Sequence, residues 1–264
     1  MDTTKRPVIF ISASLVIILV AAILFLPYRH RITIMTYNVG AFSKYKECSI
    51  QDVADIIGSE GAVAVSLNEL DSCNRRHSYY QLDSLSRVLG GWNHFFSQAF
   101  PYAGGAYGNG VVCKEPILKT YRIVLPIFDG SEQRSVAVVE TGQYVFASTH
   151  LDYKGEAAPL RQAEVISEWF RKNYPSSKKP VFLAGDMNSL PGSETISFLK
   201  KDWELLSAEE NSFDSTNPSE CIDYVFRLRS SQKVRVLESH VVKPSEKVSG
   251  ASDHLPVSVT VKWR

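Results

Sequence analysis

Apolar and polar positions recur with regular spacing along most of the chain, and the pattern predicts strands interleaved with a few helices. Alternation predicts strands over residues 32–38, 121–125, 135–140, 144–149, 222–228, 234–241 and 257–263, and short apolar runs predict strands over 62–67, 110–113 and 181–184. Helical spacing predicts helices over 49–57, 80–89, 159–170 and 193–199. This order favours a mixed α/β (α+β) sandwich of two packed sheets over a purely parallel, doubly wound sheet.

The N-terminal segment has a different pattern from the rest of the chain. Residues 8–26 carry no charge, and Ser12 and Ser14 are the only polar interruptions. Nineteen helical residues span roughly 28 Å, which is close to the hydrocarbon thickness of a bilayer. The bulky residues before Pro27 do not suit a signal-peptidase site, so we expect an uncleaved signal anchor.

The expected anchor divides the chain into a transmembrane segment at 1–31 and a globular domain at 32–264. We expect a single-pass membrane protein that contacts the membrane through residues 8–26. Basic residues flank both sides of the apolar run, so charge gives little contrast for orientation. We favour a cytoplasmic N-terminus and an extracytoplasmic domain, as is usual for a first-segment anchor.

Charge argues against a nucleic-acid-binding surface without excluding it. The whole chain carries a net charge of +1, but the part after residue 31 carries about −2. A strongly basic footprint is therefore absent from the predicted domain. The four cysteines show no C-x-x-C spacing, which makes a zinc ribbon or a thioredoxin-type site unexpected.

Polar residues that suit metal and proton chemistry follow or precede many of the predicted strands. They are Asn38, Glu69, His150, Asp186, Asn188, Asp223, Asp253 and His254. Carboxylate and amide oxygens are ligands for hard divalent cations, and histidine exchanges protons near neutral pH. Taken singly, Asp186 and Asn188 also fit an ordinary Asx turn. Asp223 lies within an apolar strand and therefore needs a partner.

The ordered set of motifs resembles the endonuclease/exonuclease/phosphatase superfamily, the fold of pancreatic deoxyribonuclease. The matching segments are Met35-Thr36-Tyr37-Asn38-Val39-Gly40, Leu67-Asn68-Glu69-Leu70-Asp71, Tyr107-Gly108-Asn109-Gly110, Glu132-Gln133-Arg134, Ser148-Thr149-His150-Leu151, Arg161-Gln162, Gly185-Asp186-Met187-Asn188, Ile222-Asp223-Tyr224 and Ser252-Asp253-His254-Leu255-Pro256. The resemblance implies a four-layer sandwich of two mixed sheets flanked by helices, preceded here by the N-terminal transmembrane helix.

The resemblance also implies a site that holds Mg²⁺ or Mn²⁺ and attacks a phosphate ester with water. Glu69 would be the principal metal ligand, with Asn38 and Asp253 nearby. The implied catalytic residues are His254, as general base or phosphate-polarising acid, Asp223, which orients it, Asp186, which positions or deprotonates the water, and Asn188 and His150. Asn188, His150 and Arg134 would bind the phosphoryl oxygens. Residues 102–110, rich in glycine, are expected to form a mobile loop beside this site.

These observations predict a membrane-anchored, metal-dependent phosphoesterase, with a phosphodiesterase as the leading hypothesis. The substrate stays open among a lipid head group, a small diester and nucleic acid. Two alternatives remain, a nuclease acting on DNA or RNA and a catalytically silent, membrane-tethered binding protein of the same fold. No protein partner is predicted.

Overall fold

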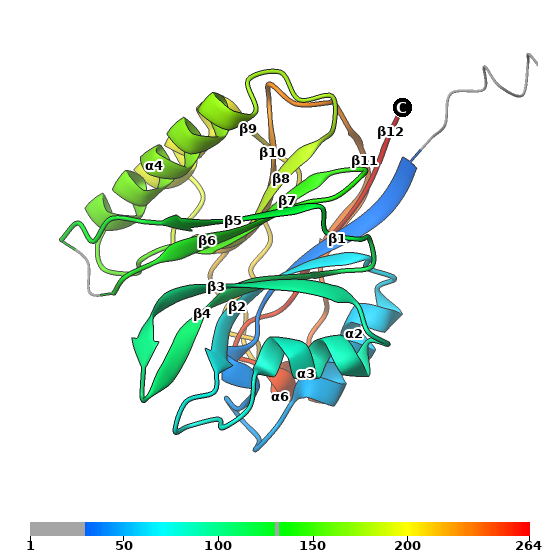
Figure 1. Ribbon diagram of the computed structural model, residues 1–264, viewed down its shortest axis with the longest axis vertical. Helices are drawn as coiled ribbons and strands as arrows, with labels where there is room; N and C mark the ends of the chain where they lie inside the picture. The colour runs from blue at the N-terminus through cyan, green and yellow to red at the C-terminus, as the bar shows by residue number, and fades with distance from the viewer. Residues whose placement is uncertain (1–29, 130–131) are drawn as a thin grey trace, which may run out of the picture. The chain divides into compact units, whose positions relative to one another are not determined.

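The computed structural model describes residues 30–129 and 132–264, which form two six-stranded sheets packed face to face (Figure 1). In spatial order the first sheet contains β11 (Arg235–Val241), β12 (Val257–Trp263), β1 (His30–Asn38), β2 (Ala64–Ser72), β4 (Gly105–Cys113) and β3 (Asn93–Tyr102). The second contains β5 (Lys119–Val124), β6 (Ser135–Glu140), β7 (Val145–His150), β8 (Val181–Asp186), β10 (Asp223–Leu228) and β9 (Trp203–Leu205). Both sheets are mixed, because β1 pairs with β2 and β7 with β8 in parallel.

Helices cover the outer faces of the two sheets. Those beside the first sheet are α2 (Ile50–Ser59), α3 (Gln81–Val88) and α6 (Glu246–Ala251), and the short helix η1 (Gly40–Phe42) follows β1. Those beside the second are α4 (Ala157–Asn173) and α5 (Glu194–Asp202). The structure therefore has the predicted layers, with two central sheets between two layers of helices (Figure 1).

The apolar spacing of α4 shows why the helices take these places. Ala163, Ile166 and Phe170 recur on one face and are fully buried against Leu183 and Phe226 of the second sheet. Arg171 and Lys172 lie in the last turn, where positive charge complements the helix dipole. A second, larger core joins the facing surfaces of the sheets to α2 and α3.

The prediction of a mobile loop over residues 102–110 is wrong. These residues end β3 and form most of β4, with a tight turn at Ala103 and Gly104. Glycine is depleted in strands, so this composition concealed the hairpin. A side chain at Gly108 would place its Cβ 2.1 Å from the carbonyl oxygen of Ser97, so the close strand approach requires glycine here.

Polar side chains connect the two sheets in the region that leads to the cleft. Ser66 Oγ lies 2.8 Å from Ser148 Oγ, and Asn68 donates to the carbonyl of Thr149 at 2.8 Å. The side-chain oxygen of Asn68 accepts the backbone N–H of Asp186 at 3.1 Å. These bonds fix the ends of β2, β7 and β8 relative to one another.

The predicted membrane segment, residues 8–26, lies outside the described residues. Among the residues that the structure describes, no helix is both long enough and apolar enough to cross a bilayer. A compact unit extends from Arg31 to Trp263.

Candidate active site

A cleft of about 350 Å³ opens where strands of both sheets end, and most of the predicted site residues line it. They are Glu69, Arg134, His150, Asp186, Asn188, Asp253 and His254. Asn38 and Asp223 are buried and contact the lining residues. The structure thus brings together side chains that are up to 216 positions apart in sequence.

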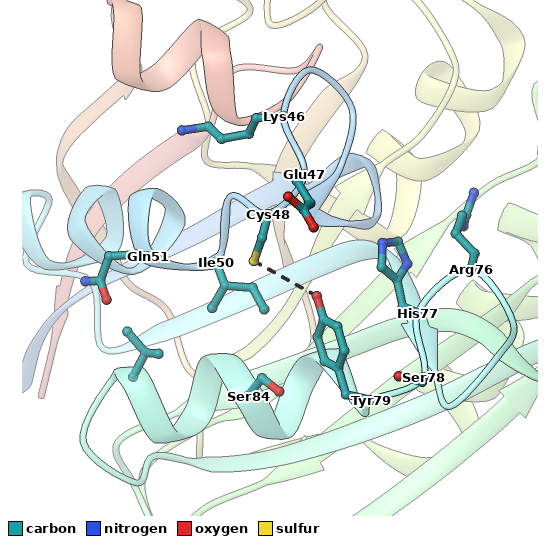
Figure 2. A pocket seen from close by; sticks show the side chains of 11 residues that line it. Lys46, Glu47, Cys48, Ile50, Gln51, Arg76, His77, Ser78, Tyr79 and Ser84 are labelled. Carbon is teal, nitrogen blue, oxygen red and sulfur yellow. Dashed lines mark hydrogen bonds between the residues drawn. The ribbon is translucent and has the colours of Figure 1, made fainter.

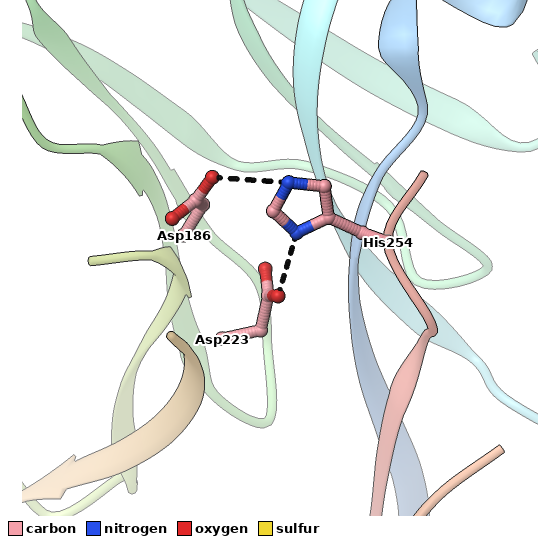
Figure 3. A group of neighbouring side chains, drawn as sticks. All are labelled: Asp186, Asp223 and His254. Carbon is pink, nitrogen blue, oxygen red and sulfur yellow. Dashed lines mark hydrogen bonds and ion pairs between the residues drawn. The ribbon is translucent and has the colours of Figure 1, made fainter. Parts of the chain in front are cut away.

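His254 lies between two buried carboxylates (Figure 3). Its Nδ1 is 2.8 Å from Asp223 Oδ2, and its Nε2 is 3.6 Å from Asp186 Oδ2. Burial alone would lower the pKa of His254, but Asp223 and then Asp186 outweigh it and raise the pKa to about 10. The imidazole therefore carries a proton at neutral pH, and its contact with Asp223 fixes its orientation.

Asp186 is surrounded by nitrogen atoms. Its Oδ2 accepts from Asn38 Nδ2 at 3.1 Å and lies 3.3 Å from His150 Nε2, while its Oδ1 accepts the backbone N–H of Asn188 at 2.9 Å. Burial raises the pKa of Asp186 to about 7, with His254 opposing the shift and Asp223 adding to it. A carboxylate in this range can accept a proton near neutral pH.

Glu69 reaches the cleft because β2 is irregular at this point. The pairing of β2 with β4 shifts between Leu67 and Leu70, and Glu69 adopts a positive φ of 60°. A bulge of this kind redirects one side chain without ending the strand. Asn38 Nδ2 donates to Glu69 Oε1 at 3.1 Å, and Asn38 Oδ1 accepts the N–H of Gly40. Asn38 thereby links Glu69 to Asp186.

Asp253 supplies a second carboxylate beside Glu69. Its Oδ2 lies 2.6 Å from Lys44 Nζ, and the hydrogen bond to Asp253 is the main cause of the raised pKa of Lys44. The charge of Glu69 raises the pKa of Lys44 further. An ammonium group thus lies in the field of both carboxylates, where a metal cation would also be stabilised.

The oxygen donors of this region fit a hard divalent cation. Glu69 and Asp253 are the candidate ligands, while the Asn38 amide directs its nitrogen to Glu69 and its oxygen to Gly40. Asp186, Asp223 and His254 also place ligand atoms within 4.8 Å of one another and could hold a metal ion. Because both imidazole nitrogens already face carboxylates, this second group is better suited to proton transfer.

The predicted phosphate-binding residues are Arg134, His150 and Asn188. His150 pairs with Asp186 from β7, whereas Asp223 pairs with Asp186 from β10, on the other side of β8. Arg134 is buried, and its guanidinium lies 3.2 Å from Glu132. Burial lowers the pKa of His150 well below its usual range, and the positive charges of Arg134 and His254 add to the shift. His150 is therefore neutral. Asn188 Nδ2 donates to the carbonyl of Leu151 at 2.9 Å, which fixes its side chain at the cleft.

Unpaired buried atoms concentrate at this site. Among the described residues, five buried side-chain nitrogen or oxygen atoms have no partner, and three of them are Arg134 Nε, His150 Nδ1 and Asp223 Oδ1. Buried polar groups are almost always paired in folded proteins, so such a concentration marks a site that is completed by a ligand.

Several residues that shape the site carry no role in the sequence analysis. Ser212 donates to Asp223 Oδ2 at 2.7 Å, and the ring of Phe213 lies 4.9 Å from that of His254. Asn68 and Lys44 contact the site through the bonds described above. Asn68 precedes Glu69 in a quoted motif, but no local pattern indicates Ser212, Phe213 or Lys44.

A second, larger cavity of about 930 Å³ lies beside α2 and α3 (Figure 2). Arg76 and His77 at its edge bind the buried Asp71, at 2.7 Å and 2.6 Å. Cys48 Sγ lies 4.0 Å from the hydroxyl of Tyr79, and all four cysteines are free thiols. His77 lines this cavity, but its carboxylate partner Asp71 lies outside the lining.

Comparisons with known proteins agree with this geometry. The model of the endonuclease/exonuclease/phosphatase family matches residues 35–254. A family protein from Bacteroides vulgatus aligns over 89% of this chain and 100% of its own, with 16% identity and a TM-score of 0.73. The mannosyl-6-phosphatase Bt3783 of Bacteroides thetaiotaomicron aligns over 87% and 99%, with 17% identity and a TM-score of 0.67. ANGEL2, a 2',3'-cyclic phosphatase, aligns over 89% and 95%, with 14% identity and a TM-score of 0.70.

No curated protein sequence matches the chain. The fold and the cleft define a class of hydrolases that act on phosphoester bonds. The chain belongs to the endonuclease/exonuclease/phosphatase family.

Proposed function

We propose that this protein is a divalent-metal-dependent phosphodiesterase that uses Mg²⁺ or Mn²⁺. The observation that carries the proposal is the buried array of Asp223, His254 and Asp186 beside the carboxylates Glu69 and Asp253 in one cleft. A bound divalent cation supplies charge neutralisation at a phosphoryl oxygen.

The protonation states of Asp186 and His254 indicate which of them accepts a proton and which donates a hydrogen bond. With a pKa near 7, Asp186 can take the proton that water loses as its oxygen bonds to phosphorus. His254 holds its proton at neutral pH and donates a hydrogen bond to the phosphoryl group as the bond to the leaving oxygen breaks. Asp223 keeps the imidazole in place through Nδ1. This assignment favours His254 as the phosphate-polarising acid over the general base.

The charge of the cleft supports a diester substrate. Five carboxylates line it, those of Glu69, Glu132, Asp186, Glu220 and Asp253, against the guanidinium of Arg134 and the imidazolium of His254. A diester carries one negative charge and is repelled less than a doubly charged monoester. The same imbalance disfavours a long polyanion, because nucleic-acid binding relies on many basic contacts with phosphates.

We also propose that residues 8–26 anchor the protein in a membrane as a single-pass segment, with the domain outside the cytoplasm. The support for an anchor is the run itself, which has 19 residues without a charge and is followed by Arg29 and Arg31.

Hydrolysis of bis(p-nitrophenyl) phosphate by the full-length protein tests the proposal. We expect turnover with Mg²⁺ or Mn²⁺, no turnover with chelator, and a loss of at least about 100-fold in Asp253→Ala. Asp83→Ala is the matched control, because Asp83 forms an exposed pair with Arg87 on α3. Activity that survives both the chelator and Asp253→Ala contradicts the proposed mechanism. Binding of the diester without turnover would support the silent binding protein.

A further inference from the structure

Three aromatic side chains line the cleft together with the catalytic residues. They are Tyr107, Tyr153 and Phe213. Tyr107 and Phe213 are half-buried, and each has a ring neighbour. Tyr107 lies 5.2 Å from Phe100, and Phe213 lies 4.9 Å from His254.

Tyr153 differs from the other two rings. It is 61% exposed, and it forms no ring contact and no hydrogen bond with any other described residue. It follows Asp152, whose carboxylate accepts the backbone N–H of Glu132 at 3.3 Å, so its loop is tied to the segment that leads to Arg134. A large ring held at the edge of a catalytic cleft without a packing partner is free to stack on a ligand.

The size and charge of the cleft restrict what such a ligand can be. A volume of about 350 Å³ is at the small end of ligand sites, which span roughly 300–1,000 Å³. It accommodates one phosphate and one compact group. Glu132 and Glu220 line the same cleft, where Glu220 exchanges backbone hydrogen bonds with Phe213, and they disfavour a second anionic group there.

We propose that Tyr153 is a specificity residue that stacks on a small, neutral, ring-shaped group, a sugar or a nucleoside, esterified to the phosphate. This inference rests on the proposed function, because the phosphate is assigned to the cleft by that function. Aromatic side chains recognise both kinds of ring through their faces. Tyr107, on β4, lines the same cleft.

The test uses three phosphodiesters that share p-nitrophenol as the leaving group. They differ in the second ester group, which is methyl, thymidine joined through its 5' oxygen, or glucose joined through its 6 oxygen. With the full-length protein and Mn²⁺, we expect a kcat/KM ratio of ring-bearing to methyl ester on the order of tenfold or more. Tyr153→Ala should lower this ratio toward one through KM, and Tyr153→Phe should retain it. Leu118→Ala, which removes another side chain with 61% exposure, is the control.

The outcomes separate this inference from the proposed function. A ratio near one in the wild type, or an unchanged ratio in Tyr153→Ala, overturns the inference and leaves the proposed function intact. Preference for only one of the two ring esters identifies the sugar or the nucleoside as the group recognised. If no ester is hydrolysed, the proposed function fails. The inference is then decided by calorimetric binding of thymidine 5'-methyl phosphate against dimethyl phosphate, with and without Tyr153→Ala.

Discussion

Asp223 is the residue on which the protonation state and the orientation of His254 depend most directly. It is buried, it accepts from Ser212, and it lies 2.8 Å from the imidazole. The apolar strand around Asp223 predicts that its carboxylate needs a partner, and the family resemblance implies that this partner is His254. Ser212 and Phe213 could not be predicted, because their roles arise from a segment that folds against β10 and His254 only in three dimensions.

Replacing Asp223 should change stability in a pH-dependent way. The folded-state pKa of His254, about 10, lies above its unfolded value near 6.5. The protonated pair therefore stabilises the fold fully below about pH 6.5 and loses this contribution as pH rises through 10. We expect Asp223→Asn to cost ~3 kcal/mol at pH 6.5 and progressively less toward pH 10.

Urea unfolding in chelator between pH 6.5 and 10 measures this difference. Asp83→Asn is the control, since its exposed pair with Arg87 should give a small difference across the range. A destabilisation by Asp223→Asn that stays constant from pH 6.5 to 10 would show that the His254 charge does not contribute.

At the scale of elements, the site depends on how closely strand ends approach one another. Periodicity predicts β6 and β12 with their observed bounds, because their alternating or apolar pattern is unbroken. It misses β3, an edge strand whose side chains are mostly half-buried or exposed. It also assigns most of β4 to a loop. Glycine lowers strand propensity in β4, although close packing requires it there.

Gly185 tests the close approach of β7 and β8. It has a φ of +150°, and a Cβ there would lie 1.8 Å from the carbonyl oxygen of Thr149. We expect Gly185→Ala to destabilise the protein by more than about 3 kcal/mol, because the strands and Asp186 would have to shift. Unfolding in urea, or the soluble yield where the variant does not fold, measures the effect.

Gly58→Ala is the matched control for this change. Gly58 lies in α2, and a Cβ there meets no atom within 4 Å. Alanine at a helical position should be neutral or stabilise by up to about 1 kcal/mol. Equal effects of the two substitutions would contradict a steric requirement at Gly185.

At the scale of the whole molecule, the site exists only when the two sheets are packed. Asn38 and Glu69 come from the first sheet, and His150 and Asp186 come from the second. The order of motifs along the sequence predicts the family and the layers. It could not give the strand order within each sheet, because pairing between distant segments follows from packing of the complete chain.

Metal binding should stabilise the whole domain, because ligands gathered from distant segments are brought together only in the folded state. At a concentration of Mn²⁺ about 100 times its dissociation constant, we expect a gain of roughly 2.7 kcal/mol. In differential scanning calorimetry, Mn²⁺ should raise the Tm of the wild type. It should raise the Tm of Glu168→Ala equally, because Glu168 is exposed on α4. An equal shift in Glu69→Ala would exclude Glu69 as a ligand.

The most direct test of the central claim is the rate of diester hydrolysis by His254→Ala beside the wild type. Mn²⁺ should raise the Tm of both, while kcat/KM of the variant falls by at least about 100-fold, because a positioned hydrogen-bond donor to the phosphoryl group is lost. His240→Ala is the control and should retain the wild-type rate. It removes an imidazole on β11 that pairs with Glu60. Turnover of His254→Ala within a few-fold of the wild type would contradict the account.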